Sequence, residues 1–297
     1  MKPKIGIVGL PNVGKSTFLN LMTEKNIAIE APWPFSTIDP ARGIVYYDKE
    51  IFYQIAENFK SKKITLPEFE LIDVAGLVKN AHQGKGLGNE FLAHLKEADI
   101  IVEIVRTFIK EDIPHINGKI DPQEDHQIIN DELYFSDLNI CERNKKKEPK
   151  INKIIEKIQK NLPPTPEEKE LAKKYGLFWL KERIIIENGN SCLSWADFSF
   201  SFKDNFSTEI KLKILEKVME KLNLTYFVTA NENETRVNLI SKDATFLDAA
   251  KTVHSDFGQK LIKVKVAPLN SPFEPVKVLS KNDKIIPESI YFFILAN

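Results

Sequence analysis

A glycine-rich stretch near the amino terminus, with one lysine and two hydroxyl side chains, has the residue types and spacing needed to bind phosphate. Residues 9–17 match G-x-x-x-x-G-K-[ST], after a short apolar strand pattern and before a helical one. Glycines let the backbone curl so that N–H groups point at phosphate oxygens, and a helix amino terminus adds partial positive charge. The sequence therefore predicts a nucleoside triphosphate site, with Lys15 at the β- and γ-phosphates and the Ser16 hydroxyl on Mg²⁺.

A second phosphate-sensing element is expected where an apolar strand ends in D-x-x-G, at Asp73 and Gly76. Such an aspartate can hold magnesium through water, and the glycine N–H can touch the γ-phosphate. Between the two motifs, three prolines in residues 31–40 forbid a regular helix. Thr37 in this loop is a candidate magnesium ligand while γ-phosphate is present, and the alternative is an ordinary loop threonine.

The elements that position these residues belong to a globular chain with a sizeable core. Its 297 residues are 42% hydrophobic and 28% charged, which indicates about two domains. The 42 basic and 42 acidic side chains cancel, which argues against a nucleic-acid coat protein. Two cysteines are too few for a disulfide scaffold or a cysteine zinc site, and no apolar run could span a membrane. We expect a cytoplasmic protein with no membrane partner.

Four motifs combine in one chain: G-L-P-N-V-G-K-S-T, P-F-S-T-I-D-P, D-V-A-G-L-V and G-x-G-L-G-N-E-F-L. Together with further segments across most of the chain, they resemble the YchF / Obg-like ATPase family of translation-factor-class P-loop proteins. The resemblance implies an α/β fold: a P-loop NTPase (Ras-like G) domain with a helical hairpin insertion and a C-terminal β-grasp (TGS) domain. The expected boundaries are 1–120 and 179–222 for the nucleotide domain, 121–178 for the insertion and 223–297 for the TGS-like domain.

The insertion combines an acidic stretch at 121–137 with a lysine-rich stretch at 142–160, whose isoleucines form an apolar stripe. One interpretation is an antiparallel helical hairpin whose opposite charges face each other or solvent. The other is an arm that faces RNA, and the coiled-coil arm of the resembled family makes ribosomal RNA a reasonable partner.

Helix starts and strand patterns place the remaining elements. Thr165, Pro166 and Glu168 predict a capped helix start. Beyond residue 223 the pattern changes to short strands with one helix, from Thr245 to Phe257, which predicts a β-grasp-like module. Thr245 followed by Asp248 resembles a capping box at the start of this helix, with Asp in place of Glu. By resemblance, this module docks on RNA or the ribosome.

Hydrolysis needs a side chain that orients the attacking water, and the residue directly after D-x-x-G in this chain cannot do so. Ras-like enzymes have glutamine there, whereas this chain has Leu77. In the resembled family a histidine from a mobile loop is proposed to take that role, and His115 is the matching residue. From the residues alone, a surface histidine without a role is the simpler interpretation. Asn12 is a candidate K⁺ ligand, which would supply positive charge where an arginine finger acts in other enzymes.

The base-reading motif is the least clear part of the sequence. No N-K-x-D follows the switch region, which argues against GTP specificity. The resembled family has N-x-x-E and prefers ATP, and here Asn188 fits the first position while Ser191 replaces the glutamate. We expect ATP, with GTP as the alternative. Residues 192–221 suggest that a further strand beside the base is missing, or that residues 194–196 do part of its work.

These features predict a Mg²⁺-dependent nucleoside triphosphatase that cleaves the β–γ phosphoanhydride and acts as a ribosome-associated switch in translation or stress regulation. The alternative is a nucleotide-gated ribosome- or RNA-binding module with little or no hydrolysis. His115 and Lys15 are the predicted catalytic residues, and Ser16 and Thr37 the metal ligands. The predicted nucleotide-binding residues are Gly9, Pro11, Asn12, Val13, Gly14, Lys15, Ser16, Thr17, Asp73, Gly76, Asn188 and Gly189.

Overall fold

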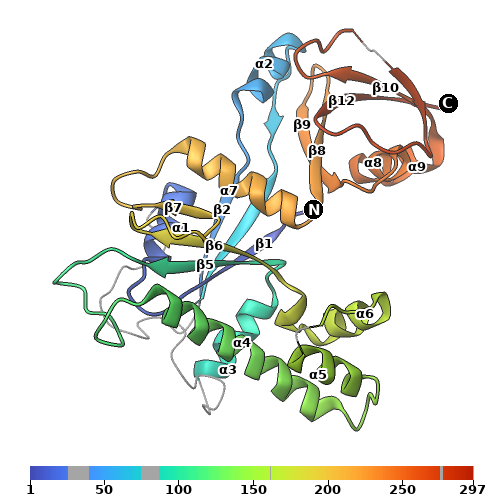
Figure 1. The fold of residues 1–297 in the computed structure, drawn as a ribbon. Helices are drawn as coiled ribbons and strands as arrows, with labels where there is room; N and C mark the ends of the chain where they lie inside the picture. The colour runs from blue at the N-terminus through green and yellow to red at the C-terminus, as the bar shows by residue number, and fades with distance from the viewer. Residues whose placement is uncertain (26–39, 75–86, 161, 275–276, 297) are drawn as a thin grey trace. The chain divides into compact units, whose positions relative to one another are not determined.

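The chain divides into two compact units, each built from separated segments around its own sheet (Figure 1). The structure is a computed structural model that describes residues 1–25, 40–74, 87–160, 162–274 and 277–296. The units consist of residues 1–2, 46–69 and 212–297, and of residues 3–45 and 70–211. We call the second the P-loop unit and the first the C-terminal unit. The three-domain division expected from sequence stays a prediction.

The P-loop unit is built on a six-stranded sheet with the order β2-β4-β1-β5-β6-β7. Its strands are β1 (Lys4–Val8), β2 (Ala41–Tyr46), β4 (Glu68–Asp73), β5 (Ile100–Arg106), β6 (Glu182–Asn188) and β7 (Phe198–Phe200). β1 pairs in parallel with β4 and β5, and β6 pairs in parallel with β5 and β7. Because these strands are parallel, the loops that follow them meet at one edge of the sheet, where α/β proteins bind ligands.

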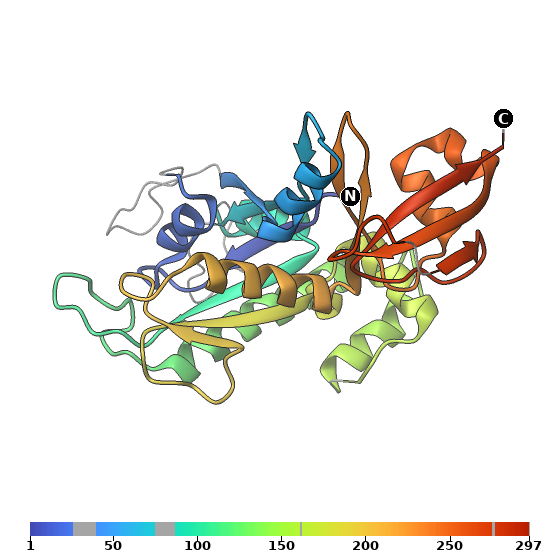
Figure 2. The ribbon, with the colours of Figure 1, turned by 90° about the horizontal axis from the view of Figure 1, so that it is seen from above.

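Helices lie on both faces of this sheet, so its strands are largely apolar. Figures 1 and 2 show α1 (Lys15–Thr23) on one face and α4 (Pro122–Asn144) on the other, together with α3 (Leu87–Lys96). All seven residues of β5 are buried. Two of them, Glu103 and Arg106, are charged, and they interrupt an otherwise apolar strand at the ligand-binding side of the unit.

The region after Asn188, which the sequence suggests is shortened, still contains a strand. β7 pairs with the end of β6, with Phe200 opposite Asn188, and completes the sheet. Its sequence, F-S-F, is only three residues long and gives too short an alternation to predict a strand. The side of the sheet where a base would lie therefore keeps a strand, though a short one.

The helical insertion contains α4, α5 (Ile151–Gln159) and α6 (Pro166–Tyr175). The predicted isoleucine stripe of α5 is confirmed, since Ile151, Ile154 and Ile158 are buried with Cys141 of α4. α6 adds a third helix to the hairpin. The predicted capping box is also confirmed: the Thr165 side chain accepts the N–H of Glu168, whose carboxylate accepts the N–H of Thr165 at 2.7 Å.

The acidic stretch of the insertion does not form the charged face expected from sequence. Asp125, Glu132 and Asp137 are buried. Asp137 accepts the N–H groups of Phe178 and Trp179 at 2.9 and 2.7 Å, and burial raises its pKa to about 7. The lysines of α5 pair instead with α6, as at Lys157 and Glu168, 2.6 Å apart. Three of the acidic residues are thus buried, while Glu124 and Asp131 stay exposed.

The C-terminal unit has a sheet with the order β11-β10-β12-β8-β9-β3. Its elements are α2 (Glu50–Asn58), β3 (Ile64–Thr65), α7 (Thr208–Lys221), β8 (Leu224–Ala230), β9 (Thr235–Ser241), α8 (Phe246–Val253), α9 (Ser255–Lys260), β10 (Leu261–Pro268), β11 (Lys277–Ser280) and β12 (Ser289–Leu295). The predicted single helix is two helices, because the chain is extended at His254. β3, from the first quarter of the chain, pairs with β9.

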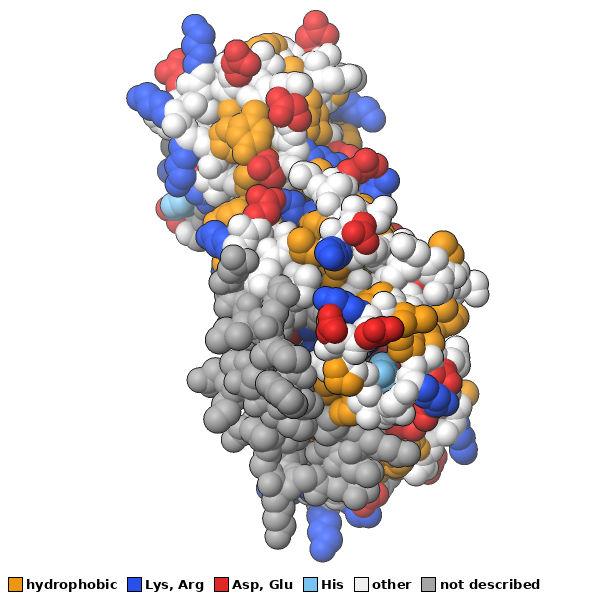
Figure 3. Space-filling model, turned by 90° about the vertical axis from the view of Figure 1, so that its left-hand side faces the viewer, with side chains coloured by type: hydrophobic (Ala, Val, Ile, Leu, Met, Phe, Trp, Pro, Cys, Tyr) orange, Lys and Arg blue, Asp and Glu red, His pale blue; other side chains and the backbone are white. Residues whose placement is uncertain are grey.

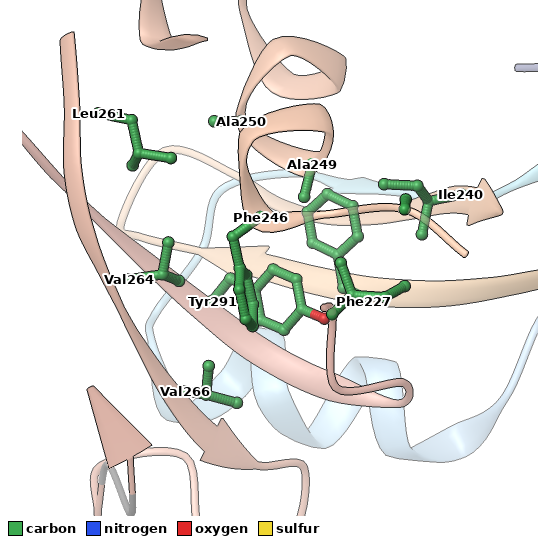
Figure 4. Packing of buried hydrophobic residues seen from close by; sticks show 11 residues of the cluster. Phe227, Ile240, Phe246, Ala249, Ala250, Leu261, Val264, Val266 and Tyr291 are labelled. Atoms are coloured by element: carbon green, nitrogen blue, oxygen red, sulfur yellow. The ribbon is translucent and has the colours of Figure 1, made fainter. Parts of the chain in front are cut away.

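Aromatic rings fill the space between α8 and this sheet (Figure 4). The rings of Phe227 and Tyr291 stack with centroids 4.6 Å apart, and Phe246 meets Tyr291 edge-on at 4.9 Å. Thr245 begins α8 with a capping box closed by Asp248, as its sequence predicts. The unit therefore has its own core, independent of the P-loop unit.

Acidic and basic side chains are interspersed over the described surface of the face in Figure 3. Among the described residues, no helix combines the length and apolarity that crossing a bilayer requires.

Candidate functional site

The phosphate loop between β1 and α1 has a backbone that only glycine fits at two positions. Gly9 and Gly14 have φ angles of 154° and 104°, in a region that side chains disfavour. A Cβ at Gly9 would lie 2.6 Å from the carbonyl oxygen of Ile104, and one at Gly14 would lie 2.6 Å from Nδ2 of Asn188. The loop is therefore pressed against β5 and β6, as a cradle for phosphate requires.

Lys15 is the first residue of α1 and its ammonium group lies beneath this loop. The residue is 8% exposed, and Nζ donates to the carbonyl oxygen of Leu10 at 2.9 Å. Burial lowers the pKa of Lys15 to about 8, although the nearby charge of Asp73 opposes this. Among the described residues, no side chain caps the amino terminus of α1, which suits the binding of an anion by its N–H groups.

Ser16 and Asp73 form a pair suited to a magnesium ion. The Ser16 hydroxyl donates to Oδ2 of Asp73 at 2.6 Å, while Oδ1 of Asp73 is buried and finds no hydrogen-bond partner among the described residues. Burial raises the pKa of Asp73. A buried carboxylate oxygen with nothing to bind, beside a hydroxyl, fits a hard cation that prefers oxygen ligands. The predicted residues Thr37 and Gly76, like Leu77, lie outside the described residues.

Asn188 connects the phosphate loop to the base side of the sheet. Its Nδ2 donates to the carbonyl oxygen of Val13 at 2.9 Å, and its Oδ1 accepts the N–H of Phe202 at 3.2 Å. Both ends of the amide are therefore engaged with the protein. The side chain of Trp195, in the segment expected to help with the base, lies instead against His126 with ring centroids 5.1 Å apart.

Glu187, which the sequence did not single out, shapes the loop after β6. Its carboxylate accepts the Thr107 hydroxyl at 2.6 Å and the N–H groups of Ser191 and Leu193 at 2.6 and 2.8 Å. Burial opposes the charge, but these hydrogen bonds outweigh it and lower the pKa of Glu187. Gly189 passes so close to Thr107 that a Cβ would lie 1.9 Å from its hydroxyl oxygen.

The loop of residues 107–121, between β5 and α4, carries His115 and extends beyond the sheet in both ribbon views (Figures 1 and 2). It contacts the phosphate loop directly, because Nδ2 of Asn12 donates to the carbonyl oxygen of Pro114 at 3.1 Å. Arg106, buried at the end of β5, donates to the carbonyl oxygens of Phe108 and Ile113 at 3.0 and 2.9 Å. Two side chains thus fix this loop beside the predicted nucleotide site.

The side chain of His115 points into the protein interior. Its Nε2 lies 2.9 Å from Oδ2 of Asp125, and each of the two side chains is only 3% exposed. Its Nδ1 accepts the N–H of Asn117 at 3.2 Å. A hollow of about 400 Å³ opens beside it, lined in part by Arg106, Lys110 and Lys119. The structure brings the loop to the site but leaves neither ring nitrogen free.

Three residues at this edge escaped the sequence analysis: Arg106, Asp125 and Glu187. Arg106 did leave a signal, because a charged residue closes a buried apolar strand. Glu187 leaves the same signal in β6, next to Asn188. Asp125 left none, since it belongs to an acidic stretch whose other members include exposed residues.

A parallel sheet with this loop after its first strand, and a buried lysine beneath the loop, defines a P-loop nucleoside triphosphatase. Residues 4–158 match the family described as "50S ribosome-binding GTPase". The chain is 31% identical to the ribosome-binding ATPase YchF of Buchnera aphidicola and 32% identical to that of Haemophilus influenzae, in each case over 89% of this chain and 88% of the relative. The chain belongs to the YchF family.

Solved structures agree with the fold. The Schizosaccharomyces pombe YchF GTPase superimposes with a TM-score of 0.76 at 24% identity, over 99% of this chain and 98% of that one. A GTP binding protein from Pyrococcus horikoshii gives a TM-score of 0.55 at 17% identity, over 100% of both chains. At these identities the likeness supports the fold alone.

Proposed function

We propose that this chain is a cytoplasmic, Mg²⁺-dependent nucleoside triphosphatase that prefers ATP, with GTP as the alternative, and acts as a ribosome-associated switch. The observation that carries the proposal is the arrangement of Lys15, Ser16 and Asp73 under the phosphate loop. Lys15 is held by one carbonyl and Asp73 has a buried oxygen without a described partner, so both groups gain when a metal–triphosphate complex binds.

Each residue has a distinct part in this proposal. Lys15 exchanges the Leu10 carbonyl for phosphate oxygens, which keeps its ammonium group charged. Ser16 and Asp73 would hold Mg²⁺, which supplies charge neutralisation at the β–γ bond. Asn12 would contribute to a K⁺ site, and His115 would orient the attacking water. Equal hydrolysis rates in Na⁺ and K⁺ buffers would argue against a K⁺ site at Asn12.

Nucleotide preference is tested by direct competition between ATP and GTP for the chain. The absence of N-K-x-D removes the aspartate that accepts hydrogen bonds from guanine, and curated relatives carry the name ATPase. We expect ATP to displace a labelled nucleotide at lower concentration than GTP. Tighter binding of GTP would reverse the assignment while leaving the phosphate site intact.

A ribosomal partner is supported by the names of the relatives and by the surface of the insertion. Lys146, Lys147, Lys153 and Lys160 are exposed and form no ion pair within 4 Å among the described residues, although the charge of Lys153 acts on Glu167, and such lysines suit a phosphate backbone. We expect Lys146→Glu with Lys153→Glu to weaken co-sedimentation with ribosomes. The matched control reverses the exposed Lys60 and Lys62 and should sediment like wild type. Equal loss in both variants would argue against the insertion as the contact.

A second candidate, a nucleotide-gated binding module with little hydrolysis, is favoured by the engagement of both His115 nitrogens. Single-turnover hydrolysis of ATP and GTP separates the two functions. The enzyme predicts a measurable rate that falls about 10²-fold or more in His115→Ala, the usual contribution of a positioned proton-transfer group. A wild-type rate no faster than that in buffer would favour the binding module.

A further inference from the structure

The contact between His115 and Asp125 joins the loop 107–121 to the first turn of α4. Nε2 of His115 lies 2.9 Å from Oδ2 of Asp125. Because Nδ1 accepts the N–H of Asn117, the proton of a neutral ring must be on Nε2, where it is donated to Asp125. In this arrangement neither nitrogen has a lone pair available for water.

Asp125 is buried, and only one of its two carboxylate oxygens has a described hydrogen-bond partner. Oδ1 of Asp125 is buried and has no hydrogen-bond partner among the described residues. The charged groups that act on Asp125 are Arg106, Asp121 and Glu124, besides His115. Burial is the largest influence on the carboxyl group and raises its pKa, while His115 opposes this. His115 therefore stabilises a charge that the protein otherwise solvates poorly.

The same loop is tied to the phosphate loop one residue away. Asn12 donates to the carbonyl oxygen of Pro114, while Arg106 holds the carbonyl oxygen of Ile113. Arg106 is 1% exposed and is also bonded to Phe108, so it fixes the start of the loop on β5. Arg106 also donates to the carbonyl oxygen of Asn12 at 3.5 Å, so Asn12 is connected both to this anchor and to Pro114, the residue before His115.

We propose that Asp125 is a positioning residue that holds His115 out of the reaction, and that a triphosphate in the phosphate loop releases His115 through the Asn12–Pro114 contact. This proposal rests on the proposed function, in which His115 orients water. It assigns to Asp125 a restraining role that the sequence did not indicate.

Single-turnover ATP hydrolysis tests the restraint. Loss of a hydrogen bond to an ionised partner shifts the equilibrium between restrained and released His115 toward release by about tenfold or more. Because Asp125 still competes for His115 in the ATP-bound chain, release there is incomplete. We therefore expect Asp125→Ala to raise the rate at saturating ATP severalfold while KM stays the same, and Glu124→Ala, an exposed carboxylate in the same turn, to match wild type. The Asp125→Ala/His115→Ala double variant should fall to the level of His115→Ala. A rate that falls in Asp125→Ala, with its melting temperature preserved, would mean that Asp125 supports the active histidine and would overturn the proposal.

NMR of the full chain with ¹⁵N-labelled histidine tests the contact without relying on activity or on the folding of an Asp125 variant. Wild type without nucleotide should show the Nε2–H tautomer for His115, with a slowly exchanging proton, and a non-hydrolysable ATP analogue with Mg²⁺ should weaken that protection. His115→Ala identifies the signal among the five histidines. Protection that is unchanged at saturation with the analogue overturns the release. If instead release occurs while His115→Ala hydrolyses ATP at the wild-type rate, the restraint stands and the catalytic role of His115 fails.

Discussion

The phosphate loop and the loop of residues 107–121 lie at one edge of the same sheet and touch through Asn12 and Pro114, yet their polar groups are in opposite states. Under the phosphate loop, a carboxylate oxygen of Asp73 has no described partner and burial lowers the pKa of Lys15. In the other loop, both nitrogens of His115 are bonded within the protein. The half with the phosphate loop thus suits a ligand, whereas in the other half the histidine is bonded within the protein, although Oδ1 of Asp125 has no described partner.

Nucleotide binding and hydrolysis therefore depend on different groups in this fold. Phosphate recognition depends on backbone shape and on neighbours in one short segment. Placement of His115 depends on side chains from β5 and α4, and it is connected to the phosphate loop through Asn12. Variants in the two loops should therefore change different quantities.

Lys15→Ala is expected to have the largest effect of any single substitution in the two loops. Removal of a charged group that contacts the transferring phosphate costs about 10²–10³ in rate. We expect a loss of that size in ATP hydrolysis, measured under single-turnover conditions, with the melting temperature unchanged or raised because a buried charge is removed. Lys25→Ala, an exposed lysine just after α1, is the control and should behave as wild type.

Nucleotide affinity should fall as the pH rises above 8. Burial lowers the pKa of Lys15 to about 8 in the free protein, and bound phosphate would raise it, so binding takes up a proton above that pH. The affinity should therefore be flat below pH 8 and decrease by up to about tenfold per pH unit above it. Calorimetry at pH 8.5, in buffers of different ionisation enthalpy, measures this uptake directly. Binding without proton uptake would place the ammonium group away from the phosphates.

Asn188→Ala should weaken binding by a smaller factor. The change leaves the Val13 carbonyl and the Phe202 N–H without their partner, and a buried unsatisfied group costs about 1–3 kcal/mol. We expect the free energy of unfolding in urea to fall by that order and nucleotide affinity to fall about tenfold, since the loop loses its support on β6. Asn190→Ala, two residues further along and exposed, serves as the control. An unchanged affinity would show that the glycines alone fix the loop.

The same contrast explains what the sequence could predict. The phosphate loop is a local pattern, because the glycines, Lys15 and Ser16 are neighbours in the chain and their roles follow from backbone geometry. Two capping boxes, at Thr165 and Thr245, were predictable for the same reason and are confirmed. Each depends on residues three positions apart.

Partners distant in sequence could not be predicted in this way. Asp125 is a member of an acidic stretch that suggested a solvated face, and only the fold of the loop buries it against His115. Arg106 binds carbonyl oxygens rather than a carboxylate, and backbone acceptors leave no mark on side-chain composition. β7 was missed because three residues carry too little periodicity, although its pairing with β6 completes the sheet.

Lys119→Ala should have the smallest effect, which makes it a sharp test of the comparison. Lys119 also connects the loop 107–121 to α4, through Asp121 and Glu124 at 3.1 and 2.8 Å, but its side chain is 63% exposed. Exposed ion pairs contribute little because water and salt screen them. We expect melting temperature and hydrolysis rate to match wild type in low and high salt. A clear rise in rate would mean that any loosening of this loop frees His115, so that the buried contact with Asp125 would have no special part in holding it.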